Sequence, residues 1–502
     1  MKEKYISTRG KEQNMTASQS IIKGLAKDGG LYVPSFIHDI KLNLNELSTM
    51  DYKNLAKAIF TEFLDDFSEA QIDACVNGAY ATGKFKDSEP VAVQKVGNRF
   101  FLELFHGPTS AFKDMALTIL PYFMTTSIEN ANLQEEIIIL TATSGDTGKA
   151  ALAGFSNVPK INIMVYYPKD GVSTIQEKQM LTQEGDNTCV IGVDGNFDHA
   201  QNGVKAIFSD HAFATQLKEQ GFSLSSANSI NIGRLLPQVI YYFYSYFQLV
   251  KSNEIQLGDK VNFVVPTGNF GNILAGHYAQ ILGLPIHQLI CASNSNNVLT
   301  DFIKTGEYNK NRDFHKTISP SMDILISSNL ERLLMSLSGD DATLINELMT
   351  NLNETGSYTI SKDLQDKICD TFKAGYANEE ETAKAIHDCF LNESYLMDPH
   401  TAVADKVYQD YVKETGDTTP SIILSTASPY KFGHSVYESI FGNIPEGMDD
   451  YQVLVALSEK TNTEIPLPLR DLDKKANLHF GTCTPSEMPQ TITDFISKKE
   501  GK

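Results

Sequence analysis

Tryptophan is absent from the 502-residue sequence, and arginine and cysteine are scarce, with six residues of each. The cysteines are widely spaced and form no CxxC pair, which argues against a zinc ribbon or a disulfide scaffold. We therefore expect reduced thiols and no metal site.

A long apolar run is missing as well. The most hydrophobic stretch, residues 235–250, is 16 residues long and is interrupted by Pro237, Gln238 and Ser245. A membrane span needs roughly 20 apolar residues, so this stretch predicts a buried helix. The opening residues, MKEKYISTRGKEQN, contain charges but no apolar region, so we expect no secretory signal and a cytoplasmic protein with no membrane partner.

Positive charge is also in deficit, because 42 Lys and Arg residues face 62 Asp and Glu residues and give a net charge of -20. Such a chain repels phosphate backbones and acidic lipid, which argues against nucleic acid or a membrane as a partner. A local pocket for a small anion stays compatible with this charge. The 41% hydrophobic and 21% charged residues are typical of a globular protein and exclude a disordered or coiled-coil chain.

The chain changes character near Pro90. Before it, residues 1–90 predict a helical unit, with Leu55, Ile59, Phe63 and Leu64 at helical spacing. After it, seven apolar runs are each followed by a loop of small residues and a helical segment: RFFLELF, EIIILTA, INIMVYYP, TCVIGV, VNFVVP, QLICAS and SIILSTA. This pattern predicts an α/β architecture of mostly parallel strands, with ligands bound beyond the carboxyl ends of the strands. Residues 313–392 are more helical and polar and are expected to cover this core.

The loop at residues 267–272, TGNFGN, follows one of these strands, and we expect a helix to begin after Asn272. Two glycines let backbone N–H groups converge beside a helix N-terminus, which would suit a phosphate group. A tight turn that needs positive φ at Gly268 and Gly271 explains the glycines equally well.

The loop at residues 141–149, TATSGDTGK, offers hydroxyl groups at another helix start and would suit a carboxylate or a phosphate. It is not a nucleotide P-loop, because Thr143 stands where a glycine is needed and Ala150 where a serine or threonine is needed. Taken alone, the loop favours simple helix capping, with Asp146 complementing the helix dipole.

Two cations stand out in apolar surroundings. Lys113, in HGPTSAFKD, comes just before the apolar run MALTILPYF, so burial and a helix dipole would lower the pKa of its amine. The more common alternative is a surface lysine paired with Asp114. Arg234 begins the most apolar helix and suits a bidentate anion, although an internal carboxylate would satisfy it as well.

Taken together and in order, several motifs resemble those of the threonine synthase family, of the longer type found in fungi and many bacteria. They are YISTRG, DGGLYVP, FHGPTSAFKD, TATSGDTGKAA, NSINIGRLLPQ, PTGNFGN, SPSMDILISSNLERL, DPHTAVA and STASPYKF. The resemblance covers nearly the whole chain. Leu330 and Ser428 depart from the Phe and His of some relatives, so the segments around them match less firmly.

The resemblance implies a fold type II pyridoxal-phosphate enzyme, similar to tryptophan synthase β, with layered mostly parallel sheets and a helical N-terminal unit. By this resemblance Lys113 is the catalytic lysine that holds pyridoxal phosphate as a Schiff base. The other residues matched to the cofactor are Gly268, Asn269, Phe270, Gly271, Asn272, Thr426 and Asp146, of which Thr426 faces the pyridine nitrogen. Those matched to the substrate are Thr143, Ser144 and Thr147 for its carboxylate and Asn228, Ser229 and Arg234 for its phosphate. The roles of Asp146, Arg332 and Lys431 stay open.

The implied reaction converts O-phospho-L-homoserine and water to L-threonine and phosphate, by β,γ-elimination of phosphate and β-addition of water. This is the last step of threonine biosynthesis. The implied organisation has an N-terminal domain at residues 1–90, a catalytic region at 91–440 and a C-terminal segment at 441–502 that packs on it. The catalytic region contains a mobile subdomain at about 115–235 and the helical insertion at 313–392. We expect a monomer, with a dimer as the alternative.

Two other interpretations compete with this one. A serine or threonine dehydratase would share the cofactor, but its substrates carry no phosphate and would leave Arg234 without a role. A non-catalytic relative would use the fold only for binding, yet every position matched above keeps a chemically competent residue.

Overall fold

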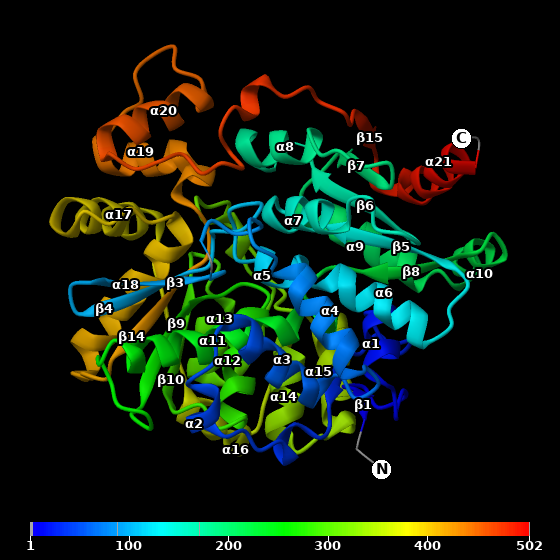
Figure 1. The fold of residues 1–502 in the computed structure, drawn as a ribbon, viewed down its shortest axis with the longest axis horizontal. Coiled ribbons are helices and arrows are strands. Elements are labelled where there is room, and N and C mark those ends of the chain that lie inside the picture. The colour runs from blue at the N-terminus through cyan, green and yellow to red at the C-terminus, as the bar shows by residue number, and fades with distance from the viewer. Residues whose placement is uncertain (1–3, 88, 170, 501–502) are drawn as a thin grey trace.

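The computed structural model describes residues 4–87, 89–169 and 171–500 (Figure 1). In this part of the chain, one sheet has six strands in the order β13-β10-β9-β14-β4-β3 and another has five in the order β15-β7-β6-β5-β8. The strands of the first are β3 (Ala92–Val96), β4 (Arg99–Glu103), β9 (Val261–Pro266), β10 (Ile286–Ser293), β13 (Phe372–Tyr376) and β14 (Ser421–Ser425). Those of the second are β5 (Glu136–Ala142), β6 (Ile161–Pro168), β7 (Thr188–Val193), β8 (Phe222–Ser226) and β15 (Gly481–Cys483).

Both sheets are parallel apart from the antiparallel pair of β3 and β4. The register sets apolar residues side by side, as where Val264 of β9 lies between Ile290 of β10 and Ile423 of β14. All seven apolar runs of the sequence form strands, which confirms the predicted α/β class. Within these two sheets, the four strands that the sequence did not reveal are β3, β8, β13 and β15, which are the edges of the sheets. An edge strand needs no continuous apolar run, because one of its sides faces solvent or loops.

The N-terminal residues form helices α1 (Ala17–Lys23), α2 (Leu44–Leu47), α3 (Tyr52–Phe63) and α4 (Glu69–Ala79). Leu55, Ile59 and Phe63 are fully buried along α3, as their spacing predicted. This unit also contains an unpredicted antiparallel pair, β1 (Tyr5–Ser7) and β2 (Tyr32–Pro34). Its core is continuous with that of the six-stranded sheet.

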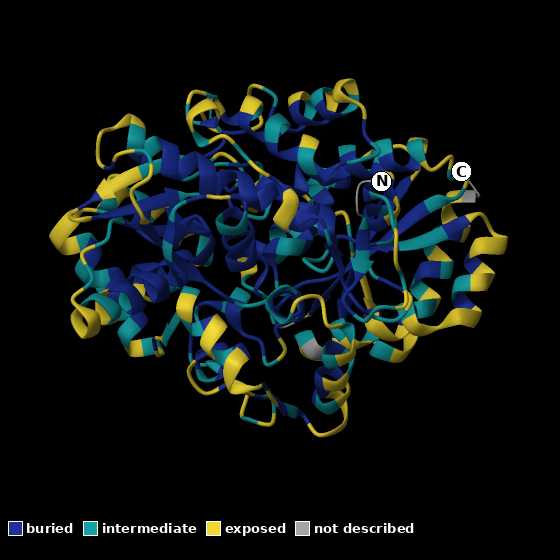
Figure 2. Cartoon of the chain, turned by 90° about the horizontal axis from the view of Figure 1, so that it is seen from below, coloured by how far each residue is buried: buried dark blue, intermediate teal, exposed yellow. Residues whose placement is uncertain are grey.

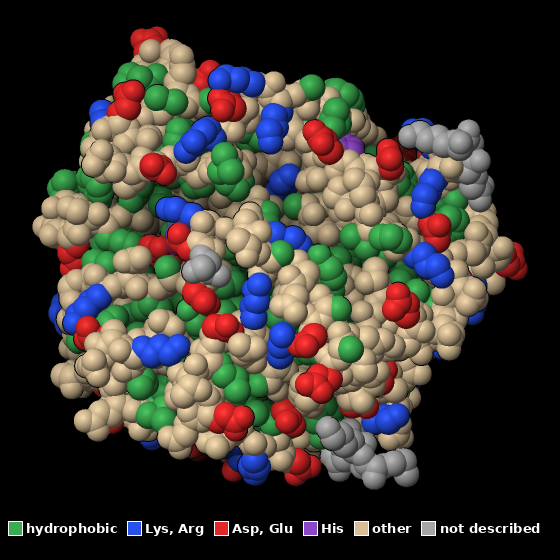
Figure 3. All heavy atoms as spheres, in the orientation of Figure 1, with side chains coloured by type: hydrophobic (Ala, Val, Ile, Leu, Met, Phe, Trp, Pro, Cys, Tyr) green, Lys and Arg blue, Asp and Glu red, His purple; other side chains and the backbone are tan. Residues whose placement is uncertain are grey.

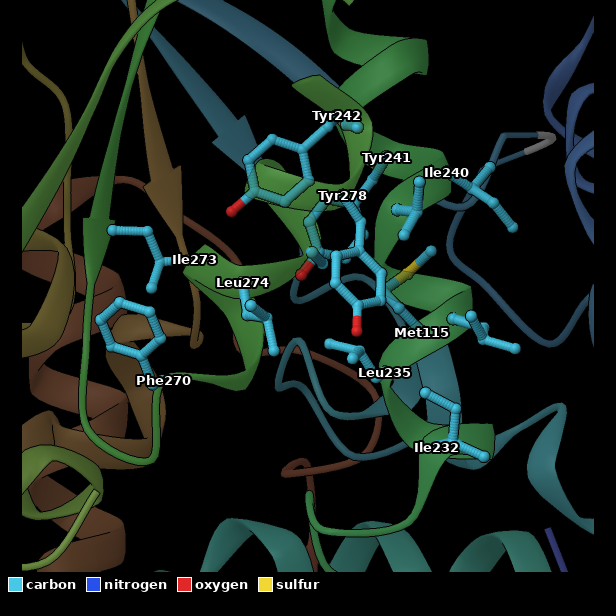
Figure 4. Packing of buried hydrophobic residues seen from close by; sticks show 14 of the residues in the cluster. Met115, Ile232, Leu235, Ile240, Tyr241, Tyr242, Phe270, Ile273, Leu274 and Tyr278 are labelled. Carbon is cyan, nitrogen blue, oxygen red and sulfur yellow. The ribbon is translucent and has the colours of Figure 1, made fainter. Parts of the chain in front are cut away.

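Helices connect and cover the strands of both sheets. They are α5 (Asp114–Leu117), α6 (Leu120–Asn130), α7 (Asp146–Phe155), α8 (Thr174–Leu181), α9 (Phe197–Ser209), α10 (His211–Glu219), α11 (Ile232–Lys251), α12 (Gly271–Ile281), α13 (Val298–Thr305), α18 (Pro399–Thr415), α19 (Gly433–Phe441), α20 (Asp450–Thr461) and α21 (Met488–Glu500). The predicted buried helix is α11, whose apolar side chains pack against those of α12 (Figure 4). Within the described residues, no helix combines the length and the apolar character that crossing a membrane requires.

The segment at 313–392 is mainly helical, as expected, with α14 (Leu330–Ser338), α15 (Ala342–Glu354), α16 (Lys362–Thr371) and α17 (Glu379–Glu393). It also provides two strands that the sequence did not indicate. The short β12 (Ser357–Thr359) pairs with β11 (Glu307–Asn309), and β13 extends the six-stranded sheet by pairing with β10. The segment is therefore part of the six-stranded sheet as well as a cover for it.

The end of the chain returns to the five-stranded sheet, where β15 pairs with β7 and α21 lies against α9. The single-turn helix η3 (Pro429–Phe432) follows β14 and η2 (Pro320–Met322) precedes α14. Figure 2 shows that the strands and the inner helices are mostly buried, while the exposed residues gather on the outer helices and loops. Acidic and basic side chains are interspersed over the face seen in Figure 3.

Candidate active site

A cavity lies beyond the carboxyl ends of β9 and β14, where the architecture predicted a ligand site. Eleven of the residues matched from the sequence line it: Lys113, Thr147, Asn228, Ser229, Arg234, Gly268, Asn269, Phe270, Gly271, Asn272 and Thr426. Thr143, Ser144 and Asp146 are not among its lining residues. Residues that the sequence did not single out complete it: Phe112, Gln238, Pro266, Thr267, Ser321, Met322 and His400.

Lys113 immediately precedes α5, and its Nζ lies 4.6 Å from the centre of the Phe112 ring. Burial lowers the pKa of Lys113 to about 8; Asp146 opposes this shift, and the positive charges of Arg234 and Lys431 add to it. The direction of this shift is the predicted one, with neighbouring cations as a further cause, and the helix that Lys113 precedes has only four residues.

The alternative of a surface lysine paired with Asp114 is wrong. The Asp114 carboxylate instead accepts hydrogen bonds from the Thr109 backbone N–H at 2.8 Å and from the Thr109 hydroxyl at 2.6 Å. Lys113 is thus a partly neutral amine at the cavity, with its neighbour Asp114 turned to the loop that precedes it.

The 267–272 loop differs from the turn that the sequence offered as an alternative. Neither Gly268 nor Gly271 has a left-handed backbone; Phe270 does, with φ of 63°, and α12 begins at Gly271 rather than after Asn272. Gly268 is required for space, because a Cβ there would lie 2.7 Å from the backbone oxygen of Ser321. The buried Phe270 ring packs near Phe372, so only its backbone is available to a ligand.

Asn272 has a donor without a partner. Its Oδ1 accepts hydrogen bonds from the hydroxyls of Tyr241 at 2.7 Å and Tyr242 at 3.0 Å, while its buried Nδ2 has no hydrogen-bond partner in the described structure. The buried hydroxyl of Ser321, which also lines the cavity, is likewise unpaired. Because an unpaired buried donor is costly, these groups suit a ligand that supplies acceptor oxygens.

Arg234 is almost fully buried, and burial lowers its pKa to about 10, so the guanidinium stays charged near neutral pH. Its NH1 donates to the backbone oxygen of Ala227, and its Nε has no partner. In the described part of the chain no carboxylate forms an ion pair with it, which contradicts the alternative of an internal carboxylate. Nearby, the Asn228 amide donates to the backbone oxygen of Ala142 at 3.0 Å, which fixes its orientation.

The 143–147 loop serves partly as a helix cap. The Thr143 hydroxyl accepts hydrogen bonds from the backbone N–H groups of Gly145 and Gly148, each at 2.9 Å, as the capping interpretation expected. Thr147 faces the cavity, and Ser144 is partly exposed.

Asp146 is held by a buried ion pair. Its Oδ1 lies 2.9 Å from the Nζ of Lys431 and accepts a hydrogen bond of 2.8 Å from Gln176. Burial raises the pKa of Asp146, but the charges of Lys431 and Lys113 outweigh burial and hold that pKa well below its usual range. Lys431 also donates to the backbone oxygen of Thr109 at 2.9 Å and so joins the start of α7 to the loop before Lys113.

His400 lies in the motif DPHTAVA but was not matched to a role. Its Nδ1 lies 2.7 Å from Oδ1 of Asp398, and its Nε2 accepts a hydrogen bond of 3.2 Å from the backbone N–H of Ser321. These two contacts orient the ring and fix the segment that covers Gly268. The sequence signal was the Asp-Pro-His start of α18, where Asp398 is also the helix cap.

Comparisons with known proteins agree with this geometry. The family model "Threonine synthase N terminus" matches residues 4–80, "Pyridoxal-phosphate dependent enzyme" matches 90–425, and "Threonine synthase, C-terminal" matches 401–475. Threonine synthase of Saccharomyces cerevisiae is 36% identical over 468 residues, which cover 87% of this chain and 89% of that protein. The chain belongs to the threonine synthase family.

Other members of the family extend the comparison. The crystal structure of the pyridoxal-phosphate-bound threonine synthase from Brucella melitensis is 35% identical, with a TM-score of 0.84 over 98% of this chain and 99% of that one. The yeast threonine synthase structure has a TM-score of 0.86 at 32% identity, over 99% of each chain. Human Threonine synthase-like 1 is 41% identical over 87% of this chain, but the chain spans only 61% of the length of that relative.

The protein is therefore a pyridoxal-phosphate-dependent enzyme with the predicted fold type II architecture. The residues present fit this cofactor. Lys113 offers an amine whose pKa is lowered to about 8, and the Gly268–Asn272 loop supplies backbone N–H groups and the unpaired Asn272 donor for a phosphate. The hydroxyl-bearing Thr426 lines the same cavity at the end of β14.

Proposed function

We propose that this enzyme converts O-phosphohomoserine and water to threonine and phosphate. The observation that carries the proposal is the buried Arg234 guanidinium, which lines the cavity with an unpaired Nε and no carboxylate partner among the described residues. A buried cation without a carboxylate partner is stabilised by an anionic ligand, and the phosphate group of the substrate is such an anion. The family membership supports the same reaction.

Two anion sites divide the cavity in this proposal. The Gly268–Asn272 loop binds the cofactor phosphate, while Asn228, Ser229 and Arg234 bind the phosphate of the substrate. Arg234 then stabilises the charge that develops on this phosphate as it leaves, which lowers the barrier to elimination.

Lys113 holds the cofactor and afterwards moves protons. When bound, pyridoxal phosphate supplies the electron sink that makes the α-proton of the substrate removable. A Lys113 amine with a pKa of about 8 is a competent base near neutral pH and can return the proton to the product. Thr426 offers a hydroxyl to the pyridine nitrogen, and a neutral partner there leaves that nitrogen less protonated.

The carboxylate of the substrate is assigned to the 143–147 loop. In this proposal Thr147 and Ser144 donate their hydroxyls, while Thr143 shapes the loop by accepting hydrogen bonds from Gly145 and Gly148. Asp146, held by Lys431, keeps one negative charge close to the Lys113 amine.

The test is a reaction assay on the purified holoenzyme. Release of phosphate from O-phosphohomoserine together with threonine is the expected result, and Lys113→Ala should abolish it. Release of a ketoacid from serine or threonine without phosphate would favour a dehydratase, and a colourless protein that turns over neither would favour a binding module. We further propose that the enzyme is cytoplasmic and monomeric. Light scattering on the holoenzyme as it elutes from a sizing column would measure its molar mass and so test whether it is a monomer.

A further inference from the structure

The N-cap and first turn of α14 contain three polar side chains that are withdrawn from solvent. Asn329 and Arg332 have 0% exposure and Glu331 has 6%. Burying an amide, a carboxylate and a guanidinium within four residues is costly unless each is fully partnered. Their partners belong to three other segments of the chain.

Arg332 is held by oxygen atoms of neutral groups. Its Nε donates to the backbone oxygen of Tyr32 at 3.0 Å, its NH2 donates to that of Ile230 at 2.7 Å, and its NH1 donates to that of Ser229 at 3.3 Å. NH1 also donates to the side-chain oxygen of Asn329. One guanidinium thus joins the N-terminal unit to the segment that contains Ser229.

Asn329 joins the segment that contains Ser229 to the Gly268–Asn272 loop. Its backbone N–H and its Nδ2 both donate to the backbone oxygen of Asn269, at 3.1 and 2.9 Å. The Nδ2 also donates to the hydroxyl of Ser229 at 3.1 Å. The Asn329 side chain therefore sets the distance between Ser229, in the proposed site for the substrate phosphate, and Asn269, in the proposed site for the cofactor phosphate.

Glu331 connects the turn to the N-terminal unit a second time. It accepts hydrogen bonds from the Thr8 hydroxyl and from the Arg9 guanidinium, the latter at 3.2 Å. The Thr8 hydroxyl in turn accepts from the backbone N–H of Leu31, next to Tyr32. The start of α14 is thus fixed by Tyr32 of β2 and by Thr8 and Arg9, which directly follow β1.

We propose that Asn329 and Arg332 are positioning residues that set Ser229 against the Gly268–Asn272 loop, and that the N-terminal unit holds them in place through Tyr32 and Glu331. This gives the N-terminal unit a part in ligand binding, although none of the residues lining the cavity belongs to it. The substrate side of this inference rests on the proposed function, because Ser229 is taken there to bind the phosphate of the substrate.

The test compares Asn329→Ala, Arg332→Met and Arg332→Lys by the affinity of the holoenzyme for inorganic phosphate, measured by calorimetry. Loss of two or more of these hydrogen bonds should raise the Kd for phosphate about tenfold in Asn329→Ala and Arg332→Met. Arg332→Lys keeps the charge and some donors, so it should recover part of the affinity. With O-phosphohomoserine as substrate, KM should rise more than kcat falls.

Two further variants separate positioning from stability. Glu331→Gln keeps the shape and one acceptor, so it should fold and raise the phosphate Kd by about threefold. Arg99 is another buried arginine, which pairs with Asp405 and Glu393 at the start of β4, the end away from the cavity. Arg99→Lys should lower Tm while leaving the phosphate Kd unchanged.

A phosphate Kd within twofold of wild type in Asn329→Ala and Glu331→Gln, whatever their Tm, would overturn the inference. Wild-type enzyme that binds phosphate but does not convert O-phosphohomoserine would overturn the proposed function instead. In that case the ranking of phosphate affinities among the variants still decides whether the turn positions the loops.

Discussion

Replacement of Lys431 by methionine should destabilise the protein more than replacement of Lys431 and Asp146 together. Methionine fills a similar volume but leaves the Asp146 carboxylate, 2% exposed, without the ammonium group that lies 2.9 Å away. Breaking one side of a buried ion pair costs about 3–5 kcal/mol, because the remaining charge is stranded. In the double variant Lys431→Met with Asp146→Asn no charge is stranded, and the amide can still accept the hydrogen bond from Gln176.

Thermal unfolding of the holoenzyme checks this order. We expect Tm to fall in the order wild type, double variant, Lys431→Met. In the apoprotein of Asp146→Asn the pKa of the Lys113 amine should fall, because the carboxylate that raises it is lost, and the pH profile of cofactor capture should shift to lower pH. A double variant whose loss of Tm equals the sum of the two single losses would refute the reasoning, since the two charges would then stabilise the fold independently.

Three further results are expected. Because burial lowers the pKa of Lys113 to about 8, the rate at which the apoprotein captures pyridoxal phosphate should rise with pH up to about 8 and level off above it; a flat profile from pH 6 to 9 would contradict this. Gly268→Ala should lower Tm and weaken cofactor binding because its Cβ would lie 2.7 Å from a backbone oxygen, whereas Gly271→Ala meets its neighbours at 3.5 Å and should keep a Tm close to wild type. Burial lowers the pKa of His277 to about 4, below its value of about 6.5 in the unfolded chain, so the unfolded state binds the proton first. Stability in denaturant should therefore fall by about 3 kcal/mol from pH 6.5 to pH 4, and His277→Gln should remove that slope.

The sequence revealed the central strands and missed the edges for one reason. A strand buried on both faces must be a continuous apolar run, as in EIIILTA, whereas edge strands such as β3 (AVQKV) and β8 (FSLSS) tolerate polar residues. The glycines of the 267–272 loop show a similar limit. The motif indicated correctly that Gly268 matters. A glycine is needed there because the backbone oxygen of Ser321 lies too close for a Cβ, and no local pattern contains a contact between residues 53 positions apart.

The site residues divide in the same way. Most residues that line the cavity lie in short motifs after strands, so motif spacing could bring them together. Lys431, His400 and Asn329 act through contacts with distant segments: Thr109, Ser321 and Asn269. Such partners depend on the folded arrangement of both sheets, and neither composition nor periodicity contains that information.

The use of the few arginines shows how an acidic chain can hold anions. Arg9, Arg99 and Arg312 each pair with a carboxylate, which cancels their charge locally. Arg234 and Arg332 are instead held by backbone and amide oxygens, and in the described part of the chain neither has an ion-pair partner. Neutral acceptors fix a guanidinium in place without cancelling its charge, so the positive potential of the site survives within a chain of net charge -20. Placing a carboxylate beside Arg234, for example by Gln238→Glu one helical turn away, should therefore abolish phosphate binding even though it changes the net charge by only one.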